Sequence, residues 1–131
     1  MRNLVWGIAV VALLASGASV WAHEEHEHQH AAGASKDQTL TGEVVDVICY
    51  LGHNKEGLGK GHAECAKKCI KSGLPVAIKV GDQLYLATME AHDPANASLA
   101  DLAGQQVTVR GHVLERDGQH LISITSVEKT Q

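Results

Sequence analysis

The chain has 131 residues, with 11 basic and 15 acidic side chains and a formal net charge of -4 when its nine histidines are neutral. This acidic balance gives no basic surface for a polyanion, and two tryptophans with two tyrosines are too few to stack a row of bases. We therefore expect no nucleic-acid partner.

Residues 1–22 have the layout of a secretory signal peptide. Arg2 supplies a positive charge ahead of an apolar run at 4–15, and small residues at 16–22 suit cleavage before His23. An uncleaved anchor is the alternative, because the apolar segment approaches the roughly 17 to 25 residues of a spanning helix. Only that alternative attaches the protein to a membrane. In either case the domain is expected outside the cytosol, in the periplasm or secreted.

Residues 23–38 form a histidine-rich arm and linker with a composition typical of disorder. Its imidazoles alternate with acidic side chains and suit zinc, copper or nickel, so the arm is a candidate secondary metal site of low selectivity. A solvated tail without metal explains the composition equally well. The four candidate ligands are His23, His26, His28 and His30.

Residues 39–131 are expected to form one mainly β domain. Runs of β-branched and alternating apolar residues predict five strands. Gly81 lies in the predicted turn between the second and third strands, and Gly118 in the predicted turn between the fourth and fifth. Gly111, in the middle of the fourth strand, predicts a bulge. The predicted strands are residues 40–49, 76–80, 83–88, 106–115 and 120–128.

A short helix is expected before the fourth strand, capped by Asn96 or Ser98 and ended by Gly104. Three strands, a helix and two strands are the element order of the five-stranded OB barrel. An open sheet with one packed helix gives the same order. The fold class is therefore mainly β, a small OB-like barrel or open sheet. Expected core residues of its last strands are Val107, Val109, Val113, Leu121, Ile124 and Val127.

An insertion at 49–74 separates the first two strands, and connections of this length inside compact domains usually carry function. Its glycines predict a loop at 51–61. A helix is predicted at 62–71, because Glu64 lies in its first turn, lysines in its last, and Gly73 follows it.

All three cysteines and two histidines lie in this insertion. His62, Cys65 and Cys69 follow a spacing of three and four residues, which places them on one helix face. Cys49 and His53 can approach that face. Thiolates with imidazole suit Cu(I) or zinc. The insertion is expected to bind one of these metals, with copper ahead of zinc. The candidate metal ligands are Cys49, His53, His62, Cys65 and Cys69.

A disulfide staple is the alternative use of the cysteines. Cys49 paired with Cys65 or Cys69 would close a loop of about 15 to 20 residues and add roughly 3 kcal/mol of stability. Pairing Cys65 with Cys69 is disfavoured, because Cβ atoms four apart on a helix are about 5 to 6 Å apart, whereas a disulfide needs about 3.8 Å. One thiol remains, to bind metal, pair with another chain or take part in redox chemistry. The protein would then be an interaction module for another cell-envelope protein.

Other polar residues give weaker signals. Met89, His92 and Asp93 follow the third strand, where the methionine and histidine could add copper ligands, although packing explains the methionine more simply. His112 and His120 are interpreted as surface side chains. No nucleophile with a base stands out, so we expect no enzyme; the isolated candidates, interpreted as solvated, are Ser98, Asp101 and Asp117.

Two segments of the insertion carry a resemblance. Cys49-Tyr50-Leu51-Gly52-His53, followed by His62, Cys65 and Cys69 in an H-x-x-C-x-x-x-C pattern, resembles a group of uncharacterised exported bacterial proteins with an OB-like domain. The resemblance extends over most of residues 39–127. It implies the fold and the location, and no established activity.

Overall fold

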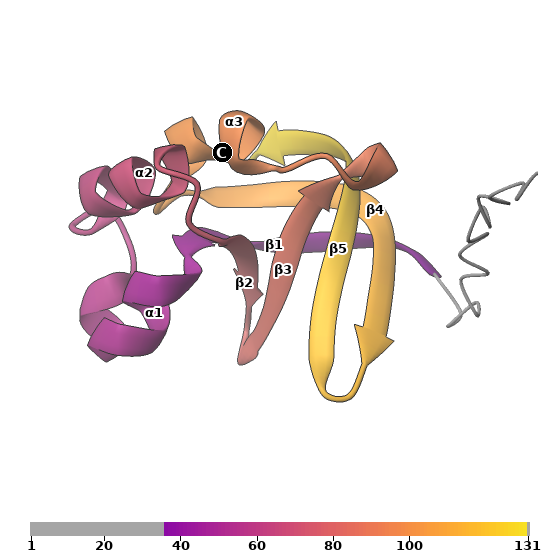
Figure 1. The fold of residues 1–131 in the computed structure, drawn as a ribbon, viewed down its shortest axis with the longest axis horizontal. Helices are drawn as coiled ribbons and strands as arrows, with labels where there is room; N and C mark the ends of the chain where they lie inside the picture. The colour runs from indigo at the N-terminus through magenta and orange to yellow at the C-terminus, as the bar shows by residue number, and fades with distance from the viewer. Residues whose placement is uncertain (1–35, 131) are drawn as a thin grey trace, which may run out of the picture.

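The computed structural model describes residues 36–130. Five strands form a closed barrel in the order β1-β2-β3-β5-β4, with β4 paired back to β1. β3 and β5 are parallel, and the other neighbours are antiparallel. The OB-like prediction is therefore confirmed, as a closed barrel rather than an open sheet (Figure 1). The strands are β1 (Lys36–Asp46), β2 (Val76–Val80), β3 (Gln83–Met89), β4 (Gln106–Arg116) and β5 (Gln119–Lys129).

The predicted signal peptide and the arm histidines lie outside the described residues. The first strand starts at Lys36, ahead of the predicted start, because this end of β1 pairs with β4, where Lys36 lies opposite Val113. Within residues 36–130, no helix is long and apolar enough to cross a membrane.

The interior of the barrel is filled by alternate residues of its strands. In β4 the predicted core residues Val107, Val109 and Val113 are buried. In β5 one assignment is wrong: Leu121 is half-buried and Ile122, its neighbour on the opposite face, is fully buried with Ile124. Side chains alternate along a strand, so an error of one residue moves a side chain to the other face.

Gly111 forms the predicted bulge in β4. The register against β5 shifts between Arg110 and Gly111. A Cβ at Gly111 would collide with the carbonyl oxygen of Ser123 on β5, so the two backbones approach too closely for any side chain.

Two short helical turns precede β4, namely α3 (Asn96–Leu99) and η3 (Ala100–Leu102). The predicted cap is wrong, because the residue before α3 is Ala95 and no side chain caps the helix. The Asn96 amide instead donates hydrogen bonds to the carbonyls of Ile70 and Leu74, each at 2.8 Å. These bonds fasten α3 to the end of the insertion.

The insertion contains α1 (Val47–His53), η1 (Asn54–Gly57) and α2 (Ala63–Lys71), and both α-helices lie on the same side of the barrel (Figure 1). The predicted helix at 62–71 is confirmed, with His62 at its N-cap position. The predicted extension of the first strand to Cys49 and the predicted loop at 51–61 are wrong over α1 and η1. The chain turns into α1 because the Asp46 carboxylate accepts hydrogen bonds from the backbone N–H of Ile48 (3.3 Å) and Cys49 (2.9 Å).

A small second core lies outside the barrel and seats α1. Val45 of β1, Val47 of α1 and Ala77 of β2 are buried together. Tyr50 of α1 and Leu58 pack against them. Apolar contacts on the outer face of β1 and β2 thus fix the orientation of α1, and with it the position of Cys49.

Candidate metal centre

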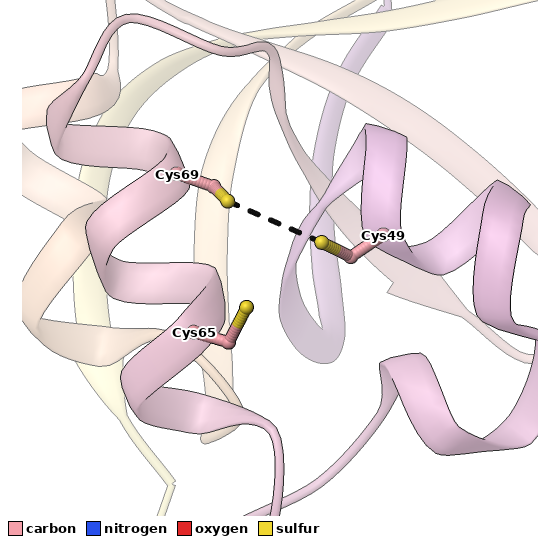
Figure 2. A group of neighbouring side chains, drawn as sticks. All are labelled: Cys49, Cys65 and Cys69. Carbon is pink, nitrogen blue, oxygen red and sulfur yellow. Dashed lines mark hydrogen bonds between the residues drawn. The ribbon is translucent and has the colours of Figure 1, made fainter.

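The barrel core fixes the position of α2. Ala66 and Ile70 are buried on the face that packs against the barrel. Cys65 and Cys69 each precede one of these anchors, so both thiols lie on a neighbouring stripe of the helix. Figure 2 shows the Cys69 sulfur directed toward Cys49 of α1 and the Cys65 sulfur in the space between the two helices.

An ion-pair cluster also holds α2. Asp101 of η3 accepts from the ammonium groups of Lys67 (2.8 Å) and Lys71 (3.1 Å) on α2. Hydrogen bonds from Lys67 and Lys71, with their positive charges, lower the pKa of the Asp101 carboxyl to about 2. Asp101 is exposed, as expected from the sequence, and it forms ion pairs with the helix that carries two of the cysteines.

We expect Asp101→Asn to be slightly less stable than the parent at pH 6, because these pairs are exposed. The pKa of Asp101 is lower in the folded chain than the ordinary value of about 3.9. The stabilisation is therefore complete above that ordinary value and is lost as pH falls toward 2. Urea unfolding of both proteins across this range should show the difference at pH 6 closing by pH 2. A difference that persists at pH 2 would show that the carboxylate charge is not its cause.

Three thiols converge between α1 and α2. The sulfur atoms of Cys49, Cys65 and Cys69 all lie within 4.8 Å of one another, and those of Cys49 and Cys69 are 4.0 Å apart (Figure 2). All three are free thiols. Cys49 is buried, Cys69 is half-buried and Cys65 is exposed, so this thiol triad has one open side.

A second group of donors shares Cys49 with the thiol triad. Ligand atoms of Asp46, Cys49 and His62 also lie within 4.8 Å of one another. We call this group the mixed triad. Asp46 is only 1% exposed, the one charged residue buried in the described part of the chain. Nε2 of His62 is buried and has no hydrogen-bond partner.

Burial and the Asp46 carboxylate keep the inner thiols protonated in the absence of a cation. A hydrogen bond with Asp46 raises the pKa of the Cys49 thiol to about 12, and burial acts in the same direction. Burial raises the pKa of the Cys69 thiol. A metal ion binds thiolate, so it must displace these protons, and its affinity is expected to rise with pH.

The structure brings together four of the five predicted metal ligands, Cys49, His62, Cys65 and Cys69, in two overlapping groups. His53, the fifth, is exposed and lies outside both groups, with its ring centroid 6.3 Å from that of His62. Sequence reasoning missed Asp46. Its signal was a carboxylate placed directly before a segment that turns out to be helical.

The weaker candidates lie outside both groups. Met89 packs against the barrel core, which agrees with packing as the simpler explanation of this residue. His92 and Asp93 are exposed. The two other histidines interact with acidic neighbours on the barrel surface: His112 with Asp37 at 2.7 Å, and His120 with Glu115 at 3.0 Å.

The donor set fits a metal ion. Three thiols within 4.8 Å form a soft site, and Nε2 of His62, a residue grouped with Cys49, has no hydrogen-bond partner. Comparisons with family models, curated proteins and solved structures found no significant match. The chemistry of these side chains is therefore the basis for inferring function.

Proposed function

We propose that this is an exported protein, periplasmic or secreted, that captures or buffers a soft transition metal through its thiol triad. The observation that supports this role is the convergence of Cys49, Cys65 and Cys69 from two different helices within 4.8 Å. Location outside the cytosol rests on the sequence of residues 1–22.

Copper, as Cu(I), is proposed ahead of zinc. Cu(I) prefers soft sulfur ligands, whereas zinc also accepts nitrogen and oxygen ligands. The thiol triad contains sulfur only, and the imidazole of His62 belongs to the mixed triad. A donor group made of sulfur alone therefore favours copper.

The proposed role is binding and not catalysis. Ser98 is exposed at the surface, Asp101 is held by two lysines, and Asp117 lies in the hairpin turn between β4 and β5. All three are exposed, which suits solvated surface residues.

The test measures metal content and free thiols in one sample of mature protein isolated from the periplasm. We expect about one tightly held copper per chain, because the triad is a single soft site. Replacing Cys65 and Cys69 together by serine should remove it. Replacing the four arm histidines, His23, His26, His28 and His30, by asparagine should leave it in place.

A disulfide-stapled interaction module is the second candidate, favoured by the 4.0 Å separation of the Cys49 and Cys69 sulfurs. These atoms would have to approach by about 2 Å to form a bond of roughly 2.05 Å. Metal-free protein with one Cys49–Cys69 disulfide and a free Cys65 thiol would contradict the metal proposal and support this one.

A further inference from the structure

The proposed thiol site leaves Asp46 and His62 without a role. We propose that these two residues, together with Cys49, form a second subsite that binds a divalent ion of the zinc class while Cu(I) occupies the thiol triad. This inference rests on the proposed function and adds a second ion to the same centre.

His62 gives the first argument. It occupies the N-cap position of α2, yet its side chain makes no capping hydrogen bond. Its Nε2 atom is buried with no partner, and buried polar atoms are nearly always satisfied. A ring nitrogen of His62 lies within 4.8 Å of the Cys49 sulfur and the Asp46 carboxylate. A metal ion bound through Nε2 would give this orphaned nitrogen its missing partner.

Asp46 gives the second argument. Its carboxylate accepts two backbone hydrogen bonds from the first turn of α1 and one from the protonated Cys49 thiol, which a metal-bound thiolate would no longer donate. A carboxylate also has lone pairs for further partners. None of the ion pairs among residues 36–130 includes Asp46. A buried carboxylate without a cation is costly, so a cation is the partner that the surroundings of Asp46 lack.

The donor types select the ion. Carboxylate oxygen, imidazole nitrogen and thiolate sulfur are the three ligand types that Zn²⁺ accepts, whereas the all-sulfur triad is softer. Charge points the same way. With three thiolates and one carboxylate ionised, a single Cu(I) leaves the centre strongly negative, and a divalent ion neutralises most of the remainder.

Cys49 is the residue common to both groups, so the two ions would share its thiolate. Cys49 is buried, and its neighbours in the two groups differ in exposure, since Cys65 is exposed and Asp46 is enclosed. Binding of one ion should therefore change the affinity for the other, in a centre with a soft outer position and a harder inner one.

The experiment uses the full mature chain in which the four arm histidines are replaced by asparagine, so that the arm contributes no zinc. The protein is loaded with one equivalent of Cu(I) and titrated with Zn²⁺ against a chromophoric chelator. Native mass spectrometry then counts both ions. We expect one copper and one zinc per chain.

Two variants and a control assign the second ion. His62→Ala and Asp46→Asn should each weaken zinc binding at least about 10-fold, since loss of a ligand should cost no less than loss of an outer-shell partner, and both should keep the copper. His53→Ala is the matched control, because this histidine is nearby but outside the mixed triad. It should bind both ions like the parent. Circular dichroism confirms that each variant is folded, and His62→Gln replaces His62→Ala if the latter is not.

The outcomes separate this inference from the proposed function. Saturation at one copper with no zinc, zinc that expels the copper, or zinc binding unchanged in His62→Ala would each overturn the second subsite while leaving the copper site intact. Failure of the parent to retain Cu(I) would instead overturn the proposed function.

Discussion

Saturating Cu(I) is expected to raise the unfolding temperature of the mature protein by about 10 to 20 °C. A ligand that binds only the folded chain, at 100 times its Kd, adds about 2.7 kcal/mol of stability. For a domain of this size, each kcal/mol corresponds to a shift of about 4 to 8 °C. The folded chain binds more tightly because only folding brings Cys49 of α1 against Cys65 and Cys69 of α2. Thermal melts at buffered free Cu(I), under reducing conditions, measure the shift.

Cys69→Ser is the variant that tests the origin of this shift. It removes the sulfur that lies 4.0 Å from that of Cys49 and should abolish most of the stabilisation. His53→Ala should melt like the parent with and without Cu(I), because His53 is exposed and outside both donor groups. Equal shifts in the parent and in Cys69→Ser would show that copper stabilises the protein from somewhere other than the thiol triad.

Most of the barrel could be predicted from the sequence because its features are encoded locally. Apolar and polar residues alternate in 106–115, which predicts a strand, and this period of two is enough to show which side chains face the core. Asp117 and Gly118 both adopt positive φ in the turn between β4 and β5, as a tight hairpin requires. The sequence left a closed barrel and an open sheet as alternatives, since closure depends on pairing between β1 and β4, which are distant in the chain.

The start of the insertion was predicted wrongly because a cap overrides strand propensity there. Val47 and Ile48 are β-branched and favour a strand, yet both belong to α1. The deciding contacts are the two hydrogen bonds to the Asp46 carboxylate. At Asn96 a cap was predicted but is not formed. Its side chain instead makes a tertiary contact with the carbonyls of Ile70 and Leu74.

Only the part of the candidate site that lies on a single helix could be predicted from the sequence. His62, Cys65 and Cys69 lie on one helix, and their periodicity places them together. Their meeting with Cys49 depends on how α1 packs on the outer face of the sheet. The burial of Asp46 beside them follows from the same packing, which is why a sequence interpretation based on cysteine and histidine omitted it.

Ile70→Ala is expected to cost about 2 to 5 kcal/mol of folding stability, the range for emptying a fully buried aliphatic site. Ile70 is 0% exposed and is the largest anchor of α2 in the barrel core. Domains of this kind have only about 5 to 15 kcal/mol in total, so a large share is lost. Urea unfolding of the metal-free protein measures the change. Ile70→Val, which removes one methylene, should cost about 0.5 to 1.5 kcal/mol.

The same substitution should weaken Cu(I) binding, because Ile70 follows Cys69 and seats the helix that carries two of the three thiols. Ile48→Ala is the matched control. It removes the same side chain from α1, where Ile48 is 53% exposed, and should change stability by no more than about 0.5 kcal/mol. If Ile70→Ala loses stability yet binds Cu(I) like the parent, the thiols do not depend on the seating of α2. If affinity and stability fall together and Ile48→Ala changes neither, the barrel core is what holds the thiols in place.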